Sequence, residues 1–360
     1  MRSLTERDVE DLISGVTILG TGGGGSPAKG LAILKKDIEQ GRRLTIASLD
    51  EIPNDALTVC SYFCGSIAPS KKKKSGAVVF EDPMGVAFER MEKYLGKRVF
   101  ATVAAELGGM NTAIPLHVAS LMNRAFLDAD YIGRAAPELL HSTASIFEVS
   151  MLPSVAVSEG GNVTIVEKCA NPNEYEGIVR NLSIVAGGSV AVVDTPVNGL
   201  VARKVTIRDT ISKSIEVGKT VREANTTGKD AISELVACLG AFLLFKGVVR
   251  KYEWEDREGF LYGEATYEGT EKWKGHWLKI WIKNENIIAW KDGEVVATAP
   301  DLICVTDEKG HGITNSELKE GMKAAVLGVK APEVWLTPKG LELFGPKHFG
   351  FPFDYTPMRA

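Results

Sequence analysis

One short stretch of the sequence concentrates side chains that can do chemistry. Asp128 and Asp130 stand two positions apart, and Arg134 and Glu138 follow them closely. Arg134 can bind a planar carboxylate or imide through two parallel hydrogen bonds. An aspartate can activate water as a general base or coordinate a metal ion. The stretch therefore predicts one wall of a site for a polar ligand or an ion, with Glu138 as a further binding group. An ion-pair corner between two domains is the alternative.

A glycine-rich loop is the second candidate element, and its consecutive glycines are Gly22, Gly23, Gly24 and Gly25. It joins two predicted helices, the second of which begins at Pro27. Exposed N–H groups at a helix N-terminus favour an anion or a carbonyl oxygen, so the loop is predicted to bind substrate. It is not a Walker loop and does not match a dinucleotide fingerprint. A tight corner between the helices is the alternative.

A strand predicted over residues 98–105 ends beside further polar side chains. Glu106 follows it directly, and Asn111 lies in the loop before the next predicted helix. Ligands of open α/β sheets bind at the carboxyl ends of the strands. Asn111 is therefore predicted to bind substrate. Glu106 is the second choice, after Asp128 or Asp130, for the group that activates water, and a surface position for Glu106 is the alternative.

The elements that must position these residues alternate between helix and strand, as in an α/β domain. Thr5 and Asp8 have the spacing of a weak capping box at the start of the first helix. A short buried strand or helix end is expected at 125–127. The expected helices are at 5–19, 27–39, 83–95, 113–123 and 137–147. The other expected strands are at 44–47, 57–63 and 98–105.

The pattern changes after residue 162, where short runs of β-branched and aromatic residues predict strands. These runs are densest over 244–298, and Asp292-Gly293 there is a strong hairpin turn. Strands are also expected at 162–167, 189–194 and 200–207, and helices at 174–186, 210–225 and 231–239. We therefore predict the α/β class, with an N-terminal α/β domain (1–165) and a β-rich C-terminal domain with interspersed helices (166–360).

Composition narrows the class of protein. The 360 residues suit two domains, and the net charge of -4 does not indicate a nucleic-acid partner. Five scattered cysteines and a charged N-terminus predict a reduced, cytoplasmic protein. The longest apolar run, 235–249, is too short to span a membrane. Four lysines at 71–74 are expected in a solvated loop, and an anion-attracting rim beside a pocket is the alternative.

Several blocks of the sequence resemble one family, the S-methyl thiohydantoin desulfurase family, which was formerly a domain of unknown function. Its members are often encoded beside, or fused to, hydantoinase/oxoprolinase proteins. The lysine run at 71–74 departs from the small and apolar residues usual in that family. The resemblance spans nearly the whole chain, and the blocks that carry it are 19–25, 128–138, 284–286, 299–303, 337–341 and 345–350.

This resemblance implies an N-terminal α/β domain, a β-rich C-terminal domain, and hydrolysis of a five-membered cyclic amide or thioamide ring. Arg134 would bind the substrate, an aspartate or Glu106 would activate water, and the glycine loop would stabilise the developing oxyanion. A divalent metal such as zinc is the other way to activate water, and the ligand types available for it are Asp128, Asp130, His117 and His311. In the helix that carries it, His117 is otherwise typical of a packing residue.

Two other functions stay open. The first is a non-catalytic accessory or sensor subunit that works beside a hydantoinase/oxoprolinase partner and only binds the small molecule. The second is a nucleotide-dependent enzyme built on the glycine loop. The aromatic β-rich domain also makes a homo-oligomer plausible.

Overall fold

Four parallel strands form the centre of the first sheet in the computed structural model, which describes residues 1–66 and 77–358. Their order across the sheet is β2 (Thr45–Ala47), β5 (Ala125–Asp130), β4 (Ala101–Ala104) and β3 (Leu57–Gly65). Most of their residues are buried, as expected for parallel strands covered on both faces. The lysine run at 71–74 lies outside the described residues.

Antiparallel strands extend this sheet on both sides. The short strand β1 (Arg2–Ser3) pairs with β2, and β9 (Ile207–Arg208) pairs with the end of β5. On the other side, β8 (Ser189–Asn198) lies between β3 and β6 (Ser154–Val157). The edge strand is β7 (Val163–Val166), which pairs with β6. Two segments beyond residue 166, β8 and β9, thus belong to the first sheet.

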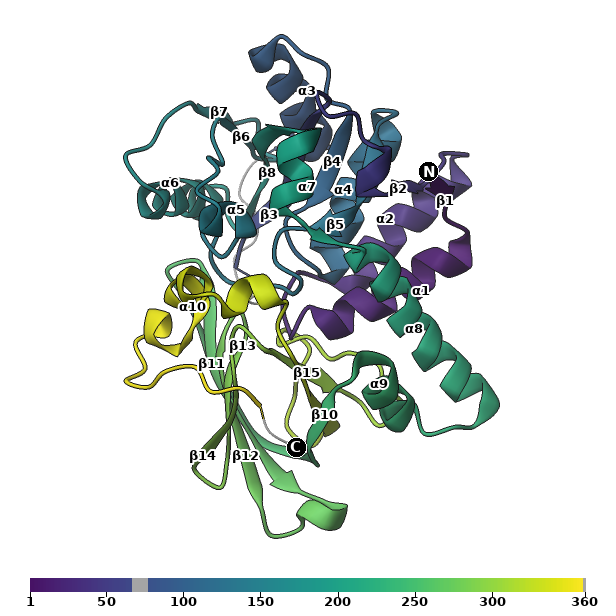
Figure 1. Cartoon of the computed structure of the whole chain (residues 1–360), viewed down its shortest axis with the longest axis vertical. Coiled ribbons are helices and arrows are strands. Elements are labelled where there is room, and N and C mark those ends of the chain that lie inside the picture. The colour runs from purple at the N-terminus through teal and green to yellow at the C-terminus, as the bar shows by residue number, and fades with distance from the viewer. Residues whose placement is uncertain (67–76, 359–360) are drawn as a thin grey trace.

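Helices cover both faces of this sheet (Figure 1). Successive residues of β3 point to opposite faces of the sheet, so Val59 packs in the hydrophobic core on one face and Cys60 packs in the core on the other face. One face carries α1 (Glu6–Leu19), α2 (Pro27–Glu39), α3 (Pro83–Leu95), α4 (Gly109–Leu121) and α8 (Thr210–Thr227). The opposite face carries α5 (Thr143–Ile146), α6 (Pro172–Val185), α7 (Gly199–Val205) and α10 (Pro338–Phe344).

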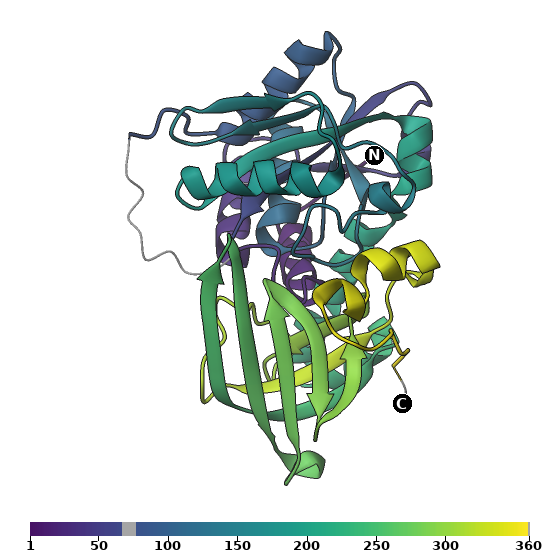
Figure 2. The same ribbon diagram turned by 90° about the vertical axis from the view of Figure 1, so that its left-hand side faces the viewer.

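The second sheet is antiparallel and lies below the first, with the C-terminal segment (yellow) at the junction (Figures 1 and 2). Asp292 and Gly293, both with positive φ, form the predicted hairpin turn between β13 (Glu285–Lys291) and β14 (Glu294–Thr298). The helix α9 (Ala231–Leu239) leads into this sheet. Across the sheet the strands are β14 (Glu294–Thr298), β13 (Glu285–Lys291), β12 (Trp277–Lys283), β11 (Phe260–Gly269), β10 (Phe242–Arg257), β16 (Lys323–Val329) and β15 (Leu302–Thr306).

The predicted fold class is confirmed: a mixed α/β region is followed by a β-rich sheet. The predicted capping box is also present, because Thr5 Oγ1 accepts the Asp8 N–H and the Asp8 carboxylate accepts the Thr5 N–H. In the described parts of the chain, no helix combines the length and apolar character that a membrane span requires.

Three local predictions were wrong. Asn111, expected in a loop before the helix, lies in the first turn of α4 (Gly109–Leu121). The strand expected at 200–207 is the helix α7, whose N-cap Asn198 accepts the Val201 N–H, and Arg203 anchors the helix by donating to the Ile52 carbonyl. Most of the helix expected at 137–147 is irregular, and only α5 is helical there. In this segment the Leu139 N–H donates to the Glu176 side chain, so it is not available for a hydrogen bond within a helix.

Candidate active site between the two sheets

A cavity of about 690 Å³ lies between the carboxyl ends of the central parallel strands and the second sheet. Ser66 follows β3, Glu106 follows β4 and Tyr131 follows β5, and all three line it. Glu285, the first residue of β13, lines it from the second sheet. The cavity therefore takes the position expected for a ligand site in an α/β sheet.

Glu106 is held in the cavity wall by two hydrogen bonds. Its Oε1 accepts the Asn111 Nδ2–H at 2.7 Å, and its Oε2 accepts the Ala136 N–H at 2.9 Å. Asn111 is itself oriented, because its Oδ1 accepts the Phe63 N–H at 3.0 Å. Burial raises the pKa of Glu106 to about 7, although both hydrogen bonds oppose that rise. Glu106 is thus oriented and titrates near neutrality.

Glu285 brings a second carboxyl group into the same cavity. It is 2% exposed, and its Oε2 has no hydrogen-bond partner among the described residues. Burial, followed by the negative charge of Glu106, raises the pKa of Glu285 well above its usual range. Two carboxyl groups in one cavity, both with a raised pKa, are the group types that a general acid and a general base require.

The glycine-rich loop is shaped around this carboxyl group. A Cβ atom on Gly23 would lie 1.7 Å from Glu285 Oε1, and one on Gly22 would lie 2.4 Å from Asn315 Nδ2. Gly24 and Gly25 line the cavity. The first two glycines therefore make room for side chains of the second domain, while the next two reach the cavity itself.

Arg180 supplies the cavity with a buried cation. It pairs with Glu176 at 2.8 Å, donates to the Gly65 carbonyl at 3.2 Å, and lies 4.0 Å from the centre of the Phe260 ring. Although burial lowers the pKa of Arg180, the negative charges around it, including Glu176, raise it overall. Its charge lowers the pKa of both Glu106 and Glu285.

Arg134, the predicted substrate-binding arginine, links the two domains through hydrogen bonds in this structure. It is fully buried and does not belong to the described lining of the cavity. Its guanidinium donates to Thr21 Oγ1 at 2.9 Å, the Asn286 carbonyl at 2.9 Å and the Asp301 carbonyl at 2.6 Å. Nε donates to the Ala135 carbonyl at 2.9 Å. Since each guanidinium nitrogen donates to a protein oxygen, the geometry gives Arg134 a structural role in place of the predicted one.

The two aspartates predicted to be catalytic belong to β5 and lie outside the described cavity wall. Asp128 accepts the backbone N–H groups of Ile211 and Ser212, at 3.0 and 2.9 Å, and so caps α8. Asp130 accepts the Gly133 N–H at 2.7 Å, and burial raises its pKa to about 7. Both carboxyl groups therefore hold backbone in place of activating water at the cavity.

The residues predicted as metal ligands are dispersed. Asp128 caps α8, His117 Nδ1 bonds to the buried Asp37 at 2.7 Å, and the exposed His311 pairs with Asp307 at 3.1 Å. The predicted metal set is therefore not assembled.

Glu138 does line the cavity, as predicted. Its Oε1 pairs with Lys283, and its Oε2 lies 2.9 Å from His348 Nε2. Burial opposes ionisation, but the hydrogen bond from His348 and the positive charge of Lys283 hold the pKa of Glu138 well below its usual range. The neighbouring His141 is neutral, because burial lowers its pKa to about 3.

Cys64, in the strand β3, also lines the cavity. Burial raises its pKa to about 12, so the thiol is not a nucleophile at neutral pH. Asp194, another residue of the cavity lining, accepts hydrogen bonds from the hydroxyl groups of Tyr62 and Tyr175, both at 2.7 Å.

Sequence reasoning gave no role to Glu285, Arg180 or Asp194. Glu285 lies in one of the blocks that carried the family resemblance, 284–286, and that membership was the available signal. Arg180 and Asp194 carry no motif. Glu176 lies only four positions before Arg180, but the Gly65 carbonyl that Arg180 contacts and the Tyr62 hydroxyl that donates to Asp194 come from distant parts of the chain.

Comparisons with known proteins fit this architecture. The crystal structure of a protein from Chromobacterium violaceum superimposes with a TM-score of 0.80, covering 100% of both chains at 20% sequence identity, which shows a shared fold. The comparison with curated proteins returned no match. A family model described as "S-Me-THD-like, N-terminal domain" matches residues 7–168, and "S-Me-THD-like, C-terminal domain" matches residues 170–358. The resemblance found in the sequence blocks is thereby confirmed, and the chain belongs to the S-Me-THD-like family.

Proposed function

We propose that this protein is a hydrolase of a five-membered cyclic amide or thioamide ring, of the hydantoin or S-methyl thiohydantoin type. The family name supports the substrate class. The observation that carries the proposal is the pair Glu106 and Glu285, two buried carboxyl groups from different domains that line one cavity. Hydrolysis of such a ring requires one group to remove a proton from water and another to protonate the substrate.

For an S-methyl thiohydantoin, the Glu106 carboxylate takes a proton from water as the water oxygen bonds to the ring carbon that carries sulfur. The Glu285 carboxyl group gives its proton to the adjacent ring nitrogen. In the second step the new hydroxyl returns its proton to Glu285 and becomes the ring carbonyl. The carbon–sulfur bond breaks, and methanethiol leaves with the proton held by Glu106. Both groups return to their initial protonation states.

The cavity suits this chemistry in two further respects. Gly24 and Gly25 bring backbone to its wall, where N–H groups can stabilise a developing oxyanion. Arg180 adds a fixed positive charge to a site where negative charge develops. In the proposed scheme these groups replace Arg134, which the geometry assigns to the domain junction.

The test is to incubate the purified protein, without a partner, with S-methyl thiohydantoins and hydantoins and to measure released thiol or ring-opened acid. Glu106→Gln and Glu285→Gln should each lower kcat/KM at least about 100-fold, in the range of general acid–base catalysis. Glu264→Gln is the matched control, since Glu264 pairs with Lys279 on the exposed surface of β11. The rate should rise with pH through about 7 as Glu106 ionises.

Saturable binding without turnover would instead favour the accessory or sensor subunit. Equal rates in wild type and both glutamine variants would exclude the carboxyl pair as the catalytic groups. The hydantoinase/oxoprolinase partner, the homo-oligomer and the cytoplasmic location stay predictions.

A further inference from the structure

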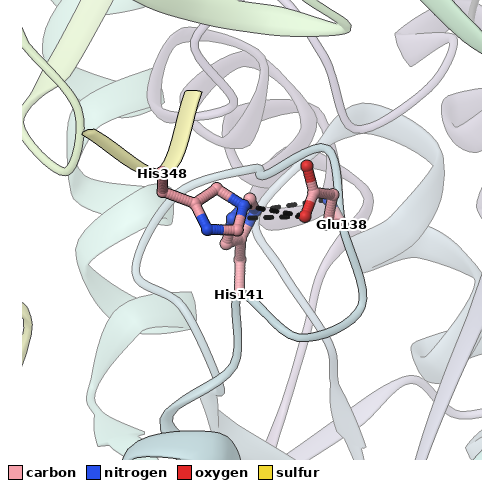
Figure 3. Close-up of side chains that lie close together, drawn as sticks. All are labelled: Glu138, His141 and His348. Atoms are coloured by element: carbon pink, nitrogen blue, oxygen red, sulfur yellow. Dashed lines mark hydrogen bonds and ion pairs between the residues drawn. The ribbon is translucent and has the colours of Figure 1, made fainter. Parts of the chain in front are cut away.

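A second group of side chains gathers beside the cavity: Glu138, His141 and His348. One potential ligand atom from each lies within 4.8 Å of the other two. Figure 3 shows the three side chains pointing toward one another. Glu138 and His141 lie in the loop after β5, whereas His348 lies in the short helix η4 (Pro346–Phe349). The fold therefore assembles this group from two distant parts of the chain.

We propose that Glu138, His141 and His348 bind one divalent transition-metal ion of the zinc class. Two imidazole nitrogens and one carboxylate oxygen are ligands that such ions prefer. Three protein ligands leave a fourth position for water or another small ligand. The proposal concerns metal binding alone and does not rest on the proposed hydrolysis.

The observation that points to a ligand is the state of His141. Its side chain is fully buried, yet Nε2 has no hydrogen-bond partner among the described residues. Glu138 Oε2 lies 3.8 Å from this nitrogen, which is beyond hydrogen-bonding distance. Buried polar atoms are nearly always paired. An ion bound between the two groups would supply the missing partner of Nε2.

The aromatic surroundings fix the histidine rings in this arrangement. His141 stacks on Phe344, with ring centres 4.3 Å apart, and meets the edge of His348 at 4.8 Å. Phe349 packs against both histidine rings. A metal site gains from ligands whose orientation is set before the ion arrives.

Two contacts oppose the ion. The first is Lys283, which brings a positive charge to the site. Lys283 pairs with Glu138 Oε1 and lies 4.5 Å from the Phe260 ring centre. The other carboxylate oxygen, Glu138 Oε2, therefore still faces the histidines. The Glu138 N–H also donates to His141 Nδ1 at 3.3 Å. Metal ligation at Nε2 places the ring proton on Nδ1, so this contact must lengthen. A hydrogen bond of that length is weak, whereas zinc ligation can drive the folding of whole domains.

The location ties the ion to the cavity. Glu138 lines the cavity, and the same loop holds Glu106 through the Ala136 N–H. An ion bound to Glu138 would therefore lie at the cavity wall. A metal-bound water loses its proton far more readily than free water. The site then offers a second source of activated water beside Glu106.

The experiment titrates chelator-treated protein with zinc chloride, and separately with cobalt chloride, in a calorimeter. Wild-type protein should bind one equivalent of either ion, and bound cobalt should show the strong visible absorption of four-coordinate Co²⁺. Glu138→Gln and His348→Gln should each weaken binding at least tenfold and remove the cobalt absorption. His348 is part-exposed, which makes His348→Gln the variant of choice if Glu138→Gln does not fold by circular dichroism.

His276→Gln is the matched control. His276 forms a similar pair with a carboxylate, Asp292, at 2.6 Å, but no third ligand completes it among the described residues. This variant should keep wild-type affinity. The proposal is overturned if wild-type protein shows no saturable binding, or if folded His348→Gln binds zinc as tightly as wild type does.

Discussion

Glu285 Oε1 lies 1.7 Å from the point where residue 23 would carry a Cβ atom. The two residues belong to different family domains, since Gly23 is within 7–168 and Glu285 is within 170–358. The absence of a side chain at residue 23 is therefore what lets a carboxyl group of the second domain reach the cavity. Exposed N–H groups are the basis for predicting that this loop binds substrate, but at residue 23 the glycine is required for the close approach of Glu285.

Gly23→Ala should displace the Glu285 carboxyl group. We expect a loss of about 1–3 kcal/mol in the free energy of unfolding, as in other overpacked sites, together with a fall in any ring-hydrolysing activity. Urea denaturation and the thiol-release assay measure the two effects. Gly177→Ala in α6 is the control, because its Cβ meets nothing within 4 Å and the change should be neutral or stabilising. Equal behaviour of the two variants would contradict the close approach.

Arg134→Lys should destabilise the protein strongly. Lysine cannot reproduce the guanidinium contacts with Thr21 and with the carbonyls of Asn286 and Asp301, and buried acceptors would lose their partners. We expect a loss of about 1–3 kcal/mol for each buried acceptor that is left without a partner. Arg250→Lys is the control, since Arg250 forms an exposed pair with Glu268. A normal melting temperature with impaired substrate binding would instead restore the ligand-binding role first expected for Arg134.

Asp128→Ala should cost about 0.5–2 kcal/mol, the range for loss of a helix cap. The N-cap residue of α8, Asp209, makes no side-chain capping bond, and Asp128 of β5 accepts the N–H groups of Ile211 and Ser212 in its place. Thermal unfolding measures the loss, and turnover per folded molecule should be unchanged. A large fall in turnover without loss of stability would make Asp128 catalytic.

Asp130 should make stability depend on pH in the opposite sense to an ion-paired aspartate. Burial raises its pKa from 3.8 to about 7 in the folded protein. The folded state therefore binds more protons than the unfolded state between these values, and stability falls as pH rises through that window. The loss is on the order of 4 kcal/mol for this group. Denaturation from pH 4 to 8 should show a smaller fall in Asp130→Asn, with the remainder due to groups such as Glu106. An identical slope in both proteins would exclude Asp130 as a source.

Local signals in the sequence were sufficient for much of the fold and for half of the carboxyl pair. The Thr5 capping box and the Asp292-Gly293 turn depend on neighbouring residues. Glu106, singled out because it follows a predicted strand, lines the cavity. The role of Arg134 could not be read in this way, because Thr21 Oγ1 and the carbonyls of Asn286 and Asp301, which accept its hydrogen bonds, lie 113 to 167 positions away. A buried structural arginine and a ligand-binding arginine look alike in sequence. The capping role of Asp128 could not be predicted for the same reason, because the helix that it caps begins more than 80 positions later.

The position of β8 has a consequence for the order in which the chain folds during synthesis. The first family domain ends at residue 168, but β8 (Ser189–Asn198) pairs with both β3 and β6. A nascent chain that has emerged only to the end of that domain has two unpaired strand edges, which are prone to pair with other chains. The α/β sheet is therefore completed only after part of the second family domain has left the ribosome, and the family boundary is not a folding boundary.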